Sequence, residues 1–192
     1  MAVIINDTSE SFETWINKDY IDKELKSIIS KASILIVPFE DLRESVGPMF
    51  PIGTDSVLYY FQRYLPQDVL IDICISDSDY QTFKFNHHYR KIGKFVVASV
   101  VVPLFINILS EYINNKFIKY DESKPQIHYI DNSTHITSID NITLPTKEYL
   151  EVSHIQFDVT IVSKDGTSKK IEFEGPSKEL ETVFKALKEY AE

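Results

Sequence analysis

Cysteine, glycine and basic residues are scarce in this sequence, and each scarcity excludes a class of protein. The 192 residues include one cysteine, Cys74, so the chain forms no internal disulfide and depends on a hydrophobic core for stability. The five glycines do not form a glycine-rich phosphate-binding loop. Lys and Arg number 20 against 29 Asp and Glu, and the resulting net charge of −9 argues against nucleic acid as a partner.

Long hydrophobic runs are also missing. The apolar stretch 95–106 has Ser99 as its single polar residue, and it is shorter than the ~20 residues of a membrane-spanning helix. The N-terminus lacks the basic region and apolar segment of a secretory signal. These absences predict a cytoplasmic protein. Lysine outnumbers arginine 17 to 3, a bias that predicts a prokaryotic or viral source.

The residues that are present predict one folded domain over 1–192, of class α/β (or α+β). Hydrophobic residues make up 43% and charged residues 26% of the chain, as in ordinary globular proteins. Residues 33–39 and 69–75 are short apolar runs typical of strands buried on both faces, and the pattern over 54–65 predicts a helix between them. A strand–helix–strand unit predicts a small parallel or mixed sheet flanked by helices.

The C-terminal segment, 121–192, is predicted to contain a β-hairpin closed by a helix. Residues 152–163 alternate between polar and apolar, an Asp-Gly turn follows, and 168–174 return as a second strand. The last helix presents one apolar face to cover the hairpin. The segment 1–120 is predicted to be rich in helix, beginning with a helical pattern over its first thirty residues. Thr8 or Ser9 is expected to cap this helix, and a break at 17–19 that divides it into two helices is an alternative. The two segments are expected to share one core because each alone is small.

The segment 94–118 has two different patterns. It is apolar all round at first and amphipathic later, which favours a buried core helix kinked at Pro103. A strand over 95–102 with Pro103 opening a helix is an alternative, favoured by the valines and opposed by the missing loop. In another alternative the helix is exposed and binds a partner or a membrane surface through Phe95, Val97, Val101, Phe105 and Leu109.

Polar residues around two strand ends form the candidate ligand site, because ligands of open α/β sheets bind outside the carboxyl ends of the strands. The expected ligand-binding residues are Glu40, Asp41, Arg43, Glu44, Thr54, Ser56, Asp77 and Asp79. Carboxylates and hydroxyls suit Mg²⁺ or another divalent metal, for which the candidate ligands are Asp77, Asp79 and His87. In the competing interpretation, the acids and hydroxyls only terminate strands and cap helices.

Motifs of catalysis are missing too: there is no nucleophile elbow, zinc pattern, P-loop, kinase signature or dinucleotide fingerprint. The leading hypothesis is therefore a cytoplasmic accessory or interaction protein that binds a protein partner or self-associates. One alternative is a metal-dependent hydrolase or nucleotide-type ligand sensor that uses the strand-end carboxylates, as in a prokaryotic stress or defence system. A second alternative is a membrane-surface protein anchored by the apolar segment 95–109.

Overall fold

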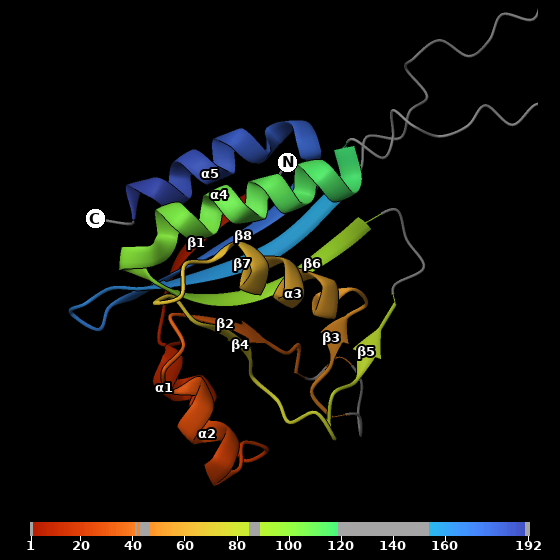
Figure 1. The fold of residues 1–192 in the computed structure, drawn as a ribbon. Coiled ribbons are helices and arrows are strands. Elements are labelled where there is room, and N and C mark those ends of the chain that lie inside the picture. Colours follow the sequence, from red (N-terminus) through yellow and green to blue (C-terminus); the bar gives the residue numbers. More distant parts are fainter. Residues whose placement is uncertain (1, 41, 43–46, 85–88, 119–153, 191–192) are drawn as a thin grey trace, which may run out of the picture.

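A computed structural model describes residues 2–40, 42, 47–84, 89–118 and 154–190 of the chain. Its centre is a mixed sheet whose strands are β1 (Ala2–Thr8), β2 (Ile34–Val37), β4 (Ile71–Ile73), β6 (Tyr89–Ala98), β7 (His154–Val162) and β8 (Ser168–Pro176). The spatial order is β1-β8-β7-β6-β2-β4 (Figure 1). Two short strands, β3 (Phe50–Pro51) and β5 (Thr82–Phe83), form a separate parallel pair. The predicted class, a mixed sheet flanked by helices, is confirmed.

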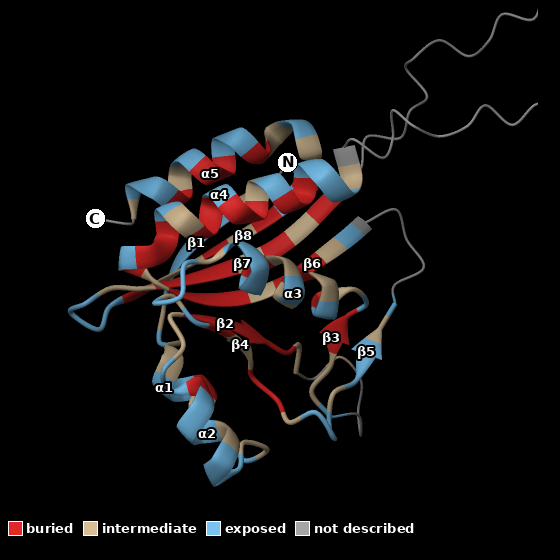
Figure 2. Cartoon of the chain, in the orientation of Figure 1, coloured by how far each residue is buried: buried red, intermediate tan, exposed pale blue. Residues whose placement is uncertain are grey.

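Helices cover both faces of this sheet. They are α1 (Phe12–Ile16), α2 (Lys23–Ile29), α3 (Thr54–Tyr64), α4 (Val102–Ile113) and α5 (Leu180–Glu189). The helices α3, α4 and α5 lie over one face, and α1 and α2 lie on the other, beneath β2 and β4 (Figure 1). Buried residues concentrate along the central strands and on the sheet-facing sides of α4 and α5 (Figure 2). The larger core therefore lies between the sheet and α3, α4 and α5.

The predicted strand–helix–strand unit is present as β2, α3 and β4. The strands β2 and β4 pair in parallel, and all four residues of β2 are buried, as their apolar run predicts. On its other side β2 pairs antiparallel with β6. The strand β6 pairs in parallel with β7, so residues before 120 and after 153 belong to one sheet.

The predicted C-terminal hairpin and helix are confirmed. The strands β7 and β8 pair antiparallel from His154 opposite Pro176 to Val162 opposite Ser168. Apolar side chains of β7 at every second position are buried beneath α4 and α5, with polar side chains between them on the opposite face. A short 3₁₀ turn, Ser177–Glu179, leads into α5, whose buried side chains are Leu180, Val183, Phe184 and Leu187.

The prediction of a continuous helix over 94–118 is wrong for its first part. Residues up to Ala98 extend β6, because their β-branched side chains pair with β2 on one side and β7 on the other. A 3₁₀ turn, Ser99–Val101, replaces a loop, and Pro103 stands in the first turn of α4, where no backbone donor is needed. A π-helical turn, η2 (Asn114–Ile118), ends the helix.

The five side chains predicted to form an interaction helix do not share one helix, and all are buried. Phe95 and Val97 belong to β6, Val101 to the 3₁₀ turn, and only Phe105 and Leu109 to α4. All five pack in the larger core, so they present no surface to a partner or a membrane. Among the described residues, no helix is both long enough and apolar enough to cross a membrane.

The N-terminal helical prediction is also wrong in part. Residues 2–8 form the strand β1, which pairs antiparallel with β8. Helix begins after Ser11, whose side chain accepts a hydrogen bond from the Thr14 amide while the Thr14 hydroxyl accepts one from the Ser11 amide. A second helix begins after Asp22, whose carboxylate caps the helix by accepting a hydrogen bond from the Leu25 amide. The helical spacing of Phe12, Trp15 and Ile16 is confirmed by α1. The alternative of two helices is confirmed as well, because α1 ends at Ile16 and α2 begins at Lys23.

Candidate functional site

The carboxyl ends of the parallel strands β2 and β4 lie side by side, as the candidate ligand site requires. The Cys74 amide, directly after β4, donates a 2.8 Å hydrogen bond to the Ile36 carbonyl. Four of the predicted site residues, Asp41, Arg43, Glu44 and His87, lie outside the described residues. Of the predicted ligand-binding residues, Glu40, Thr54, Ser56, Asp77 and Asp79 are described.

Glu40 is occupied by neighbours within the protein. Its carboxylate lies 2.8 Å from Lys18 Nζ and accepts a 3.0 Å hydrogen bond from the Tyr20 hydroxyl. Lys18 Nζ also lies 5.0 Å from the centre of the Trp15 ring. Glu40 thus connects the end of β2 to the segment between α1 and α2, a structural role.

The turn after β4 is likewise held by its own hydrogen bonds. The Ser76 hydroxyl donates to the Asp79 carboxylate over 2.8 Å, and Asp77 is exposed. Burial raises the pKa of Asp72, and the negative charge of Asp77 raises it further. Within the described part of the chain, no three side chains among His, Cys, Asp and Glu gather as a metal site.

Thr54 and Cys74 are buried and play structural parts. The Thr54 hydroxyl donates a 2.8 Å hydrogen bond to the Pro51 carbonyl at the start of α3. Burial raises the pKa of the Cys74 thiol to about 12, and the charge of Glu40 contributes to the same shift. A nucleophilic cysteine needs a lowered pKa, so Cys74 is a buried apolar side chain, as its sequence context predicts.

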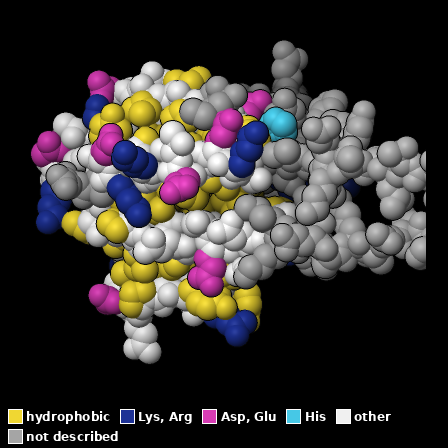
Figure 3. Space-filling model, turned by 90° about the horizontal axis from the view of Figure 1, so that it is seen from above, with side chains coloured by type: hydrophobic (Ala, Val, Ile, Leu, Met, Phe, Trp, Pro, Cys, Tyr) yellow, Lys and Arg dark blue, Asp and Glu magenta, His cyan; other side chains and the backbone are white. Residues whose placement is uncertain are grey.

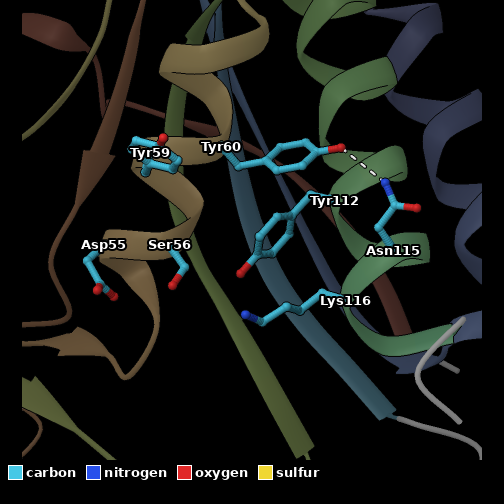
Figure 4. Close-up of a pocket in the computed structure, with 7 residues that line it drawn as sticks. All are labelled: Asp55, Ser56, Tyr59, Tyr60, Tyr112, Asn115 and Lys116. Carbon is cyan, nitrogen blue, oxygen red and sulfur yellow. Dashed lines mark hydrogen bonds between the residues drawn. The ribbon is translucent and has the colours of Figure 1, made fainter. Parts of the chain in front are cut away.

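A hollow of about 450 Å³ opens between α3 and the end of α4 (Figure 4). It is lined by Asp55, Ser56, Tyr59, Tyr60, Tyr112, Asn115 and Lys116. One side comes from the first two turns of α3, and the other from the last turn of α4 together with η2. We call this site the tyrosine hollow.

Helical geometry explains why α3 presents these side chains. Val57 and Phe61, four residues apart, are buried against the sheet. Asp55 and Tyr59, also four apart, therefore lie on an exposed side of the helix. On the opposite wall, the π-helical turn begins directly after α4 and brings Asn115 and Lys116 to the hollow.

The two walls of the tyrosine hollow are connected by direct contacts. Asn115 Nδ2 donates a 3.2 Å hydrogen bond to the Tyr60 hydroxyl. The rings of Tyr60 and Tyr112 meet edge to face, with centroids 5.3 Å apart. The Tyr60 ring also packs against the Tyr64 ring of the same helix, with centroids 4.6 Å apart. These contacts hold Tyr60 and Tyr112 in place, whereas Tyr59 remains 67% exposed.

The hollow carries one charge of each sign on opposite sides, Asp55 on α3 and Lys116 on η2 (Figure 4). Neither forms a salt bridge with another described residue. Burial raises the pKa of Tyr112 to about 12, and the charge of Asp55 adds to this shift. The Tyr112 hydroxyl is therefore neutral at physiological pH and serves as a hydrogen-bond donor or acceptor. The residues that line the hollow include no histidine or cysteine.

Sequence reasoning identified only Ser56 of this hollow as a site residue. The sequence does contain a pattern that indicates two further residues of the hollow. Tyr59 and Tyr60 are adjacent on a helix whose core face is already occupied by Val57 and Phe61. An exposed aromatic side chain is therefore expected there. The facing residues come from a segment some fifty positions away, and only the fold brings them to α3.

The tyrosine hollow is the candidate functional site. It combines aromatic rings and hydroxyl groups with two charges that have no ion-pair partner among the described residues. No protein-family model, curated protein or solved structure matches this chain.

Proposed function

We propose that the protein is a non-catalytic binding protein that holds a segment of a partner polypeptide in the tyrosine hollow. The observation that carries the proposal is Tyr59, 67% exposed beside a 450 Å³ hollow whose other rings, Tyr60 and Tyr112, are held in place. Tyrosine is enriched at the energetic centres of protein interfaces, because it offers a large apolar ring and a hydroxyl with few rotatable bonds.

The charges of the hollow define the partner segment. An apolar or aromatic side chain would pack on the tyrosine rings, as large apolar anchors do in interface pockets. A basic side chain beside Asp55 and an acidic one beside Lys116 would neutralise these two charges. The expected partner is therefore a short segment with an apolar anchor between residues of opposite charge.

The competing hydrolase or sensor hypothesis has less support from side-chain geometry. Glu40 is engaged by Lys18 and Tyr20, and Asp79 by Ser76. A carboxylate with such internal partners has fewer free lone pairs for a metal or a ligand. The tyrosine hollow, in contrast, keeps Asp55 and Lys116 without ion-pair partners among the described residues.

A displayed random-peptide library tests this proposal without a known partner. The native protein is used to select peptides, and the Kd of each selected peptide is measured by fluorescence anisotropy for variants of the hollow. We expect selected peptides to bind Tyr59→Ala about tenfold or more weakly, because removal of an interface anchor costs more than about 1.4 kcal/mol. Asp55→Lys is expected to weaken the binding of peptides that carry a basic residue.

Ile28→Ala is the matched control for these measurements. Ile28 is also an exposed large apolar side chain, 54% accessible, but it lies on α2 across the sheet from the hollow. Its truncation should leave every Kd unchanged. If no peptide is selected, or if the selected peptides bind the Tyr59 and Ile28 variants equally well, the hollow is not a polypeptide-binding site.

A further inference from the structure

The strand β1 is an outer strand of the six-stranded sheet and offers a free backbone edge. Its residues, Ala2–Thr8, pair antiparallel with Ser168–Glu174 of β8, without a register shift. On its other side, β1 has no strand neighbour among the described residues. An edge strand presents a row of unpaired N–H and C=O groups that can pair with another chain.

The residues of β1 themselves lack the features that usually protect an edge strand against pairing. Proteins shield edge strands with lysine, proline, bulges or very short strands. The seven residues of β1 include neither lysine nor proline, and their register with β8 contains no bulge. The opposite edge strand, β4, is only three residues long. The edge at β1 is thus long and regular, and the edge at β4 is short.

Exposed apolar side chains lie in the middle of the same strand. Ile4 is 47% and Ile5 38% exposed, although β7 and β8 bury the apolar side chains of their core-facing positions. Because consecutive strand residues point to opposite faces, these two isoleucines flank the free edge above and below the sheet. An incoming strand would cover both.

We propose that β1 pairs antiparallel with β1 of a second copy of this chain, so that two six-stranded sheets join into one continuous sheet. Antiparallel pairing of identical edges is closed and two-fold symmetric, which limits the assembly to a dimer. The middle residue of β1 is Ile5, so a two-fold axis near it brings Ile4 and Ile5 of both copies together.

Charge favours this antiparallel arrangement. Asp7 is the one charged residue of β1, and it lies near one end of the strand, with its carboxylate 2.8 Å from Lys169 Nζ. Antiparallel pairing places the two Asp7 side chains at opposite ends of the new strand pair. Parallel pairing would instead set them side by side, which is unfavourable for like charges.

Sedimentation velocity over a wide range of protein concentrations tests the dimer. The native chain should pass from monomer to dimer as concentration rises. Ile4→Lys places a charge beside the new pair and should weaken dimerisation about tenfold or more. Asn6→Pro removes a backbone donor from the strand and gives a second, independent perturbation. Ile28→Lys, at a position on α2 that is at least as exposed as Ile4, should leave the dimer intact.

Oxidative cross-linking adds a readout that does not depend on destabilising the chain. Ile5→Cys lies at the proposed axis, directly opposite its copy, and should form an interchain disulfide, while Ile28→Cys should not. A native chain that stays monomeric at every concentration overturns the proposal. It is also overturned if Ile4→Lys dimerises like the native chain, or if Tyr59→Ala abolishes the dimer and so assigns the contact to the tyrosine hollow.

Discussion

Asp158 is a carboxylate placed among charges in the middle of the sheet. It lies on β7 with Lys94 of β6 directly opposite on one side and Glu172 of β8 on the other. Burial raises the pKa of Asp158, and the neighbouring charges of Lys170, Lys94 and Lys91 act in the opposite direction. The ionised form is therefore less favourable in the folded state than in the unfolded chain.

The raised pKa predicts how stability responds to pH. Below the ordinary aspartate pKa of 3.8, Asp158 is protonated in both states and contributes nothing. As pH rises from 3.8 to the folded pKa, the unfolded chain ionises first, because its carboxylate is exposed to water. The free energy of unfolding falls over this range and stays lower above it, where the ionised carboxylate is buried in the folded state. Asp158→Asn should therefore increase the free energy of unfolding at about pH 7 and have a much smaller effect near pH 4, measured by urea denaturation.

Asp165 gives a control of opposite sign. The Thr167 hydroxyl and amide donate hydrogen bonds of 2.7 and 2.9 Å to its carboxylate, and these bonds lower its pKa. Its stabilising effect is present above the ordinary pKa and is lost as pH falls, so Asp165→Asn should be destabilising mainly near neutral pH. If both variants change stability in the same direction at neutral pH, the assignment of the Asp158 shift is wrong.

At the scale of elements, α3 depends on the backbone of Gly53. This residue caps the helix with φ of +93°, a conformation that favours glycine, and no atom lies within 4 Å of where a Cβ would stand. Asp55 and Ser56, in the first turn of α3, begin one wall of the tyrosine hollow. The glycine therefore fixes the direction in which α3 leaves the loop.

Gly53→Ala should reduce the free energy of unfolding by about 1 kcal/mol, through backbone strain alone. Urea denaturation followed by circular dichroism measures the change. Gly47→Ala is the matched control, because a Cβ there also meets nothing within 4 Å and its φ is not positive. Equal destabilisation by the two variants would contradict the role given to the backbone of Gly53.

The element that local pattern misassigned most is the junction of β6 and α4. Its apolar residues suit either a buried strand or a buried helix, since neither shows a polar face. Pairing with both β2 and β7 favours the strand up to Ala98. The 3₁₀ turn Ser99–Val101 then changes the chain direction without a polar loop, a connection that hydrophobic periodicity does not reveal.

At the scale of the whole molecule, one core unites the two segments of the chain. Phe95 of β6 and Phe61 of α3 pack in the same cluster as Phe157 of β7 and Phe184 of α5. The surface above this core, seen over α4 and α5, carries basic and acidic side chains interspersed (Figure 3). This mixture suits a solvated face and leaves the tyrosine hollow and the β1 edge as the surfaces proposed for binding.

The shared core predicts that the protein unfolds as one cooperative unit. Trp15, the single tryptophan, is buried beneath the sheet and reports on α1 and β2. Its fluorescence and the hydrogen exchange of β7 amides should give the same urea midpoint, since β7 pairs directly with β6. Two separated midpoints would show instead that the segments 1–120 and 121–192 unfold independently.

Elements with a local pattern follow from the amino-acid sequence alone. The apolar run of β2, the helical face of α3, the alternation of β7 and the closing helix α5 follow from hydrophobic periods of about 2 or 3.6 residues, which side-chain geometry imposes. Of the tyrosine hollow, such a local pattern predicts only Ser56 as a ligand-binding residue, because Ser56 lies at a helix entrance that the sequence marks.

Tertiary structure alone decided the rest. The strand β1 forms because β8 offers it an edge, and β6 is a strand because two neighbours pair with it. The tyrosine hollow exists because α4 packs beside α3 and brings Asn115 to Tyr60, a contact between positions 55 residues apart. Such contacts are set by the energy of packing distant elements together, and no local period in the sequence encodes that energy.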